Sequence, residues 1–449
     1  MKLPWVLLSW STVFTLILLL GAFVLAIILY RIALIFAFTA VDHAIESHYT
    51  ILILSTSSVL NLFFIVTFNY LYKFVAMWLT EKELHRTQTS YDASLTFKIY
   101  LFRFINTYAS TFYVAFIKGQ WIGTPNKYHR LFGFRQEECN PGGCFMELTI
   151  QLAVLFMGKQ FLMGIVEYGK PIARRLFKQM RRGDLKEEED ESAVEVGTPQ
   201  HIKDFKLVEL GSLGLFKEYL EMVIQYGFIT IFVTAFPLAP LFALFNNFLE
   251  IRLDAKKILE LHRRPIAQKV RSIGVWFQIM ETVGWISIIT NALIIAITSE
   301  FIPKAVYLYH YSQDQSLAGY VDFSLSRIDM IDIDAQAQIL PIYLNATCRY
   351  PDFMTGPGDM GVKPYSPNLK FWHIWFARLL FVILFTLVIM VIVTTVKLLI
   401  PDVPSSLKYR IRRETFITTQ LMVEVEKERV ATASRKRKTE QAASSLVQN

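Results

Sequence analysis

The sequence predicts an all-α fold, a polytopic transmembrane helical bundle of about eight spans. Of its 449 residues 53% are hydrophobic and only 19% are charged, a balance that is unusual for a water-soluble chain of this size. Apolar runs recur at the length of roughly 20 residues that a helix needs to cross a hydrocarbon layer about 30 Å thick. Short basic segments lie beside these runs, as in proteins whose cytoplasmic loops carry the positive charge.

Eight apolar runs qualify as spans, and together they make residues 1–413 a transmembrane region followed by a charged cytoplasmic tail at 414–449. A signal peptide is the alternative for the first run, but its length and the lack of a cleavage site favour a span. Pro237 and Pro240 predict a tight turn between the fifth and sixth runs. The runs cover about 5–36, 51–79, 95–116, 145–167, 218–236, 238–261, 275–298 and 371–400.

Loop charge sets the predicted orientation. Basic residues concentrate in loops at about 80–94, 168–217 and 262–274, which we assign to the cytoplasm. An even number of spans then places both termini there, and the loops at about 117–145 and 299–370 face outward. Asn345 begins the sequon Asn-Ala-Thr in the second outer loop, so we expect it to be glycosylated.

Cysteine content and net charge exclude several classes of protein. Cys139, Cys144 and Cys348 lie in the outer loops, where disulfides are permitted, and the sequence leaves open which of them pair. They lack the spacing of a zinc site. The net charge of +8 follows from the loop pattern and predicts contact with membrane lipid, not with nucleic acid.

Acidic residues on the fourth, fifth and sixth runs are the strongest functional signal. A carboxylate at the centre of a spanning helix costs about 2.5 to 3.5 kcal/mol. Glu218 and Glu221 are three residues apart, and Glu250 and Asp254 are four apart, so each pair shares a helical face. Glu167, at the inner end of the fourth run, lies at a similar predicted depth.

Five carboxylates at one depth would repel one another unless cations join them. Oxygen ligands without clustered histidine or cysteine favour Ca²⁺ over zinc or copper. The alternative is a set of interfacial acids paired with Lys217, Lys256 or Lys257. Five acids on three consecutive spans favour the calcium site.

Several ordered motifs resemble the anoctamin family of calcium-activated chloride channels and phospholipid scramblases. They are spread over almost the whole chain, so the resemblance is specific. The motifs are Arg86-Thr87-Gln88-Thr89, Pro141-Gly142-Gly143-Cys144, Gly158-Lys159-Gln160, Glu218-Tyr219-Leu220-Glu221-Met222, Phe236 to Leu244, Asn246 to Lys257, Phe301-Ile302-Pro303 and Ile400-Pro401-Asp402-Val403-Pro404.

The resemblance implies that the five acids are calcium ligands. One departure is Met163, which stands where the family usually has an asparagine ligand, and this puts the affinity of one ion position in question. The family has ten spans, and this chain begins at what resembles the third, which suggests a truncated form. The resemblance further implies a homodimer in which calcium gates a separate path for chloride or phospholipid in each subunit.

Arg31, Lys118 and Lys159 are candidates to attract chloride or lipid phosphate along that path. Arg31 and Lys118 could equally extend to the outer interface, the commoner role of such side chains. No catalytic motif of an intramembrane hydrolase is present, so we do not expect an enzyme. The remaining alternative is a truncated, nonconducting scaffold or regulatory subunit. We favour the plasma membrane over the endoplasmic reticulum as its location.

Overall fold

In the computed structural model the chain forms two compact units, residues 1–386 and 387–449. Helices dominate the part of the chain that the structure describes. That part comprises residues 2–39, 46–120, 122–124, 127–131, 134–136, 139, 143–158, 199, 201, 205, 207, 214–263, 270, 272–329, 332, 347–359, 363–401 and 403–447.

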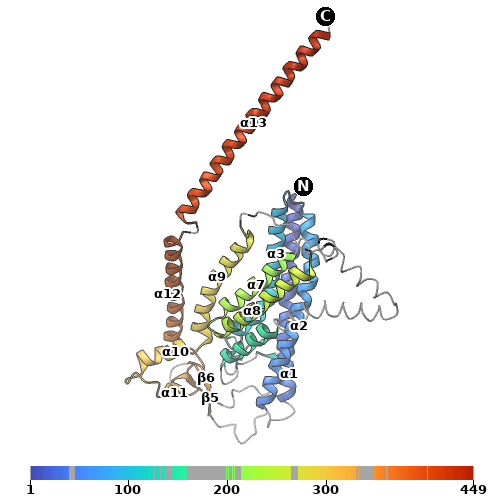
Figure 1. Ribbon diagram of the computed structural model, residues 1–449. Coiled ribbons are helices and arrows are strands. Elements are labelled where there is room, and N and C mark those ends of the chain that lie inside the picture. The colour runs from blue at the N-terminus through green and yellow to red at the C-terminus, as the bar shows by residue number, and fades with distance from the viewer. Residues whose placement is uncertain are drawn as a thin grey trace, which may run out of the picture. The chain divides into compact units, whose positions relative to one another are not determined.

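The first three helices pack side by side (Figure 1). They are α1 (Lys2–Thr39), α2 (Glu46–Lys82) and α3 (Gln88–Phe112), the last of which continues as the π-helical turn η1 (Tyr113–Ile117). The hydroxyl of Thr87 begins α3 by accepting a hydrogen bond from the backbone N–H of Ser90 at 3.3 Å, which satisfies one of the free donors at a helix start.

A buried ion pair ties the loop between α2 and α3 to its helices. Lys98 and Glu83 are hydrogen-bonded through side chains only 0% and 2% exposed. The same carboxylate accepts a hydrogen bond from Ser94 Oγ at 3.0 Å and lies 2.9 Å from His85 Nε2. Because a buried charge is stable only when paired, this pair fixes the loop geometry.

The next helices complete the packed bundle. A turn at 232–238 separates α7 from α8, which confirms the turn predicted from the two prolines. One of these, Pro240, lies in the first turn of α8, where its missing N–H costs nothing. The elements are a helix at Cys144–Gly158, α7 (Gly214–Ile231), α8 (Ala239–Lys256) with η2 (Lys257–Leu261), and α9 (Val275–Leu293) with η3 (Ile294–Thr298).

Tyr108 holds α3 against α7 at the centre of the core. Its side chain is almost fully buried, and its hydroxyl donates to the carbonyl of Ile224 at 2.8 Å. Its ring lies 4.9 Å from that of Phe228. A Cβ at Gly227 would collide with the Tyr108 hydroxyl, so only glycine allows this close approach.

The loop between α9 and the last apolar helix folds around a small second core. Tyr320, Phe323 and Ile374 form its centre, next to α10 (Phe301–Val306), η4 (Tyr307–Tyr311) and α11 (Tyr320–Ser324). Strands β5 (Leu325–Asp329) and β6 (Thr347–Pro351) pair antiparallel, with Arg327 opposite Arg349. Two shorter hairpins, β1 (Gly123–Thr124) with β2 (Lys127–Tyr128) and β3 (Arg130–Leu131) with β4 (Phe134–Arg135), lie in the earlier loop. These hairpins are an addition to the predicted all-helical fold.

Four helices in the described part are long and apolar enough to cross a membrane, at Pro4–Leu34, Thr56–Lys82, Val275–Thr298 and Leu369–Leu399. The last is α12. The chain is therefore a helical membrane protein. Each of the eight predicted spans overlaps a helix, but eight crossings stay a prediction. In the second unit, α13 (Ser405–Val447) forms one long helix whose side chains are exposed over residues 405–434.

Candidate calcium site and polar cavity

Three of the predicted ligands lie together between α7 and α8. Glu218 comes from the first turns of α7, and Glu250 and Asp254 lie one helical turn apart on α8. One carboxylate oxygen from each residue lies within 4.8 Å of the other two, and all three side chains are half-buried. The helical spacing on α8 explains why its two carboxylates share a face.

The donor chemistry of this cluster fits calcium. Calcium takes oxygen ligands at about 2.3 to 2.6 Å, so oxygens on opposite sides of one ion are about 4.8 Å apart. The three carboxylates meet that requirement without any rearrangement of the helices. They would supply three of the six to eight oxygens that calcium prefers.

Lys257 contacts the same carboxylates. Its ammonium lies 2.5 Å from Glu218 Oε1 and 3.7 Å from Asp254 Oδ1, and it joins the first residue of η2 to both helices. This confirms one of the lysine pairings weighed as an alternative to metal binding. The cluster can therefore hold a positive charge, and the lysine and a metal ion need the same oxygens.

A chain of side-chain amides is hydrogen-bonded to the cluster. Asn246 Nδ2 donates to Glu250 Oε2 at 2.9 Å and to Gln225 Oε1 at 3.1 Å. Gln225 Nε2 in turn donates to Asn247 Oδ1 at 2.7 Å. The bond from Asn246 to Glu250 lies within α8 and orients the Glu250 carboxylate, whereas the two bonds that involve Gln225 join α7 to α8.

The other two predicted ligands are placed differently. Glu221 is buried, 6% exposed, and interacts electrostatically with Arg103 of α3. It does not belong to the cluster found among the described residues. Glu167 and Met163 lie outside the described residues. The ligand roles of Glu167 and Glu221 stay predictions.

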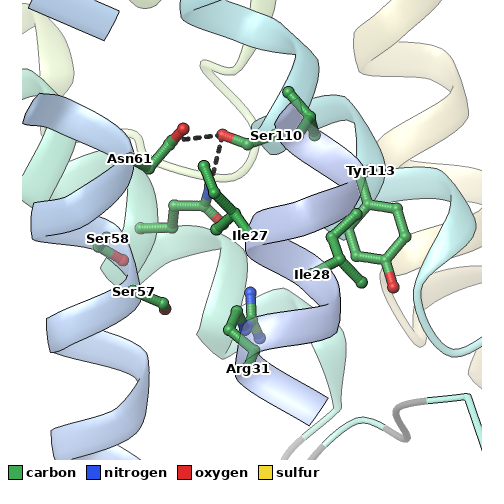
Figure 2. A pocket seen from close by; sticks show the side chains of 10 residues that line it. Ile27, Ile28, Arg31, Ser57, Ser58, Asn61, Ser110 and Tyr113 are labelled. Atoms are coloured by element: carbon green, nitrogen blue, oxygen red, sulfur yellow. Dashed lines mark hydrogen bonds between the residues drawn. The ribbon is translucent and has the colours of Figure 1, made fainter. Parts of the chain in front are cut away.

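Polar side chains surround a small cavity between α1, α2, α3 and the helix at 144–158. Its volume is about 20 Å³, enough for about one water molecule. Figure 2 shows Ser110 at its upper edge, where its hydroxyl accepts from Asn61 Nδ2 at 2.7 Å and from Gln151 Nε2 at 3.0 Å. Ser57, Ser58, Arg31 and Tyr113 complete the polar lining.

Two basic side chains meet one carboxylate beside this cavity. Glu147 Oε1 and Oε2 accept hydrogen bonds from Lys118 Nζ at 2.7 and 2.6 Å, and Arg31 also donates to Oε1. All three side chains are at most 8% exposed. The side chains of Arg31 and Lys118 are thus buried against Glu147, and their role on the path stays a prediction.

Glu147 is the site residue that sequence reasoning missed. One acid at the start of an apolar run carries no distinctive spacing, and its partners lie 116 and 29 residues away in the chain. Lys159 and Asn345, two further predicted functional residues, lie outside the described residues.

A disulfide joins Cys139 to Cys144 in the loop before the fourth helix. Gly119 lies against it with φ of +78°, and the position of its missing Cβ is 2.9 Å from Cys144 Sγ. Cys348 is a free, exposed cysteine on β6. The structure thus decides the pairing that the sequence left open.

The chain matches a family described as "Anoctamin: Calcium-activated chloride channel" over residues 1–414. The chain belongs to the anoctamin family. It is 39% identical to anoctamin-4 of Homo sapiens over 96% of this chain and 46% of that protein. Identity to human anoctamin-5 is 39% over 95% of this chain and 47% of the relative. For human anoctamin-1 the values are 37%, 91% and 42%.

This anoctamin spans less than half the length of the relatives it matches. Membership agrees with a helical membrane protein and with a family whose description names calcium activation and chloride conduction.

Proposed function

We propose that this protein is a calcium-activated transporter of anoctamin type, which conducts chloride, scrambles phospholipid, or does both. The observation that carries the proposal is the convergence of Glu218 of α7 with Glu250 and Asp254 of α8 within 4.8 Å. Three carboxylates at that separation and half buried repel one another strongly. A divalent cation removes that repulsion, and binding free energy becomes available to move a helix.

Calcium would be held by Glu218 from α7 and by Glu250 and Asp254 from α8, with Glu221 and Glu167 as further proposed ligands. When bound, the ion would supply two positive charges that offset the repulsion between the carboxylates of neighbouring helices. The amide of Asn246 keeps Glu250 turned toward the cluster. Lys257 provides a weaker, tethered positive charge at the same oxygens.

The polar cavity supports a transport path along α1, α2, α3 and the helix at 144–158. Its hydroxyl and amide side chains can hydrogen-bond to chloride or to lipid headgroups, which purely apolar helix surfaces cannot do. Arg31 and Lys118 place two basic side chains beside this lining, where both contact Glu147. Basic side chains on such a path favour an anion or a phosphate group. Lys159 is proposed as a third basic residue on this path.

The assembly and location complete the proposal. We propose a homodimer in the plasma membrane, with both termini cytoplasmic and Asn345 glycosylated on the outer side. Support comes from the basic loops and the position of the sequon.

The test is reconstitution of the full chain into liposomes, with chloride flux and lipid exchange measured on one preparation as calcium is titrated. We expect calcium to activate at least one of the two activities. Glu250→Gln should shift half-activation to higher calcium by about 10-fold or more, as expected when a ligand of charge-dependent affinity is neutralised.

Glu281→Gln is the matched control, because Glu281 is an exposed acid on the spanning helix α9. Its calcium response should equal that of the unsubstituted chain. A calcium response that is equally insensitive to Glu250→Gln would refute the proposed site. Calcium binding without either transport activity would refute the transporter proposal and favour the alternative, a nonconducting regulatory subunit.

A further inference from the structure

Two histidines from different elements face each other beside the second core. His310 lies on η4 and His373 lies in the first turns of α12. Their ring centroids are 5.2 Å apart and their planes are inclined at 78°. His310 is exposed and His373 is half-buried, so solvent reaches the pair.

The separation of the rings matches that of two imidazoles on one metal ion. A zinc ion lies about 2.1 Å from each ligating nitrogen, and the ring centroids lie about 1.1 Å beyond, so a tetrahedral angle separates the centroids by about 5.2 Å. The observed distance is 5.2 Å. Imidazole is the ligand that divalent zinc, copper and nickel share.

Tyr311 orients the half-buried ring. Its hydroxyl lies 2.9 Å from Nδ1 of His373, and when Nδ1 carries the proton that hydroxyl is its acceptor. Nε2 then keeps the lone pair that binds metal, the arrangement usual for histidine ligands.

The second core packs next to both histidines. Ile374, next to His373, is 1% exposed, and Tyr311, next to His310, packs against the same core with its ring centroid 4.8 Å from that of Phe323. Packing of these neighbours reduces the conformational freedom that the histidines lose when a metal joins them.

We propose that His310 and His373 form a binding site for a divalent transition metal of the zinc class, separate from the carboxylate site. The remaining positions on the metal are left to water. Bound metal would cross-link η4 to α12 and so tie the loop that follows α9 to the start of the last apolar helix.

The test is a Zn²⁺ titration of the purified full chain in saturating calcium, with binding measured by calorimetry. Saturating calcium occupies the carboxylate site, and Cys348→Ser as the background removes the exposed thiol. We expect one saturable site. Either His310→Ala or His373→Ala should weaken zinc binding at least about 10-fold, and the two losses should not add in the double variant, because both residues serve one ion.

Two further variants separate a metal site from simple packing. Tyr311→Phe should weaken zinc binding by about 10- to 100-fold, as expected for loss of an orienting partner. His129→Ala is the control, since His129 is exposed and distant in sequence from the pair, and it should leave binding unchanged. Saturable zinc binding of unchanged affinity in both His310→Ala and His373→Ala overturns the proposal. The absence of saturable zinc binding in the Cys348→Ser background with both histidines present also overturns it.

Discussion

Replacing Lys257 by glutamine is expected to tighten calcium binding. The ammonium of Lys257 lies 2.5 Å from Glu218 Oε1 and 3.7 Å from Asp254 Oδ1. Calcium needs those oxygens, so the ion must either displace the ammonium or bind beside it against charge repulsion. In both cases the lysine opposes calcium, and removing its charge removes that opposition.

The size of the effect follows from the exposure of the pair. The three side chains are 21%, 23% and 27% exposed, so each contact resembles a partly solvated ion pair worth about 0.2 to 1 kcal/mol. The two contacts together are worth about 0.4 to 2 kcal/mol, which corresponds to an affinity gain of about 2- to 30-fold at about 1.4 kcal/mol per decade.

The assay is calorimetric calcium binding to the purified full chain, with half-activating calcium in liposomes as a second readout. Lys256→Gln is the control, because it makes the same charge change at the adjacent, exposed position. Lys257→Arg keeps the charge and should bind calcium about as the unsubstituted chain does. Equal shifts in Lys257→Gln and Lys256→Gln, or weaker binding in Lys257→Gln, would refute the reasoning.

Two further predictions concern stability, measured as the free energy of unfolding in detergent. Gly119→Ala adds a Cβ that collides with Cys139 Sγ at a residue with left-handed φ, so it should destabilise the protein by about 1 to 3 kcal/mol more than Gly143→Ala. Gly143 is the control because it has a similar φ with open space around it. Equal losses of stability in the two variants would exclude the collision. Glu83→Gln leaves a buried lysine unpaired and should cost about 3 to 5 kcal/mol, whereas the exposed Glu81→Gln should cost little. Burial acts to raise the pKa of Glu83, but the hydrogen bonds and charge of its partners lower it below the usual value. The contribution of Glu83 to the free energy of unfolding is therefore present above the usual glutamate pKa and lost as pH falls through the lowered pKa. The difference in unfolding free energy between Glu83→Gln and the unsubstituted chain should become smaller in acid. A difference that is constant with pH would contradict this.

The helices and the core of the candidate calcium site can be predicted from sequence because both depend on local patterns. Apolar runs of membrane length overlap the observed helices, and the four-residue spacing of Glu250 and Asp254 puts both on one face of α8. The proline pair located the turn that brings Glu218 on α7 next to them. Each of these signals lies within a single segment of the chain.

The features that sequence reasoning missed depend on contacts between distant segments. Glu147 acquires its meaning only from Arg31 and Lys118, which lie on other helices. The facing of His310 and His373 likewise follows from the packing of the second core. No spacing rule relates such residues, because tertiary packing alone brings them together.

A double-mutant cycle on calcium affinity tests the central claim most directly, that α7 and α8 share one ion. Glu218→Gln and Asp254→Asn are measured singly and together in the purified full chain, with the exposed Asp314→Asn as control. A shared ion predicts that each single variant weakens binding and that the losses are not additive, with a coupling of at least about 0.5 kcal/mol. Strictly additive losses, or calcium affinity that neither substitution changes, would contradict the account.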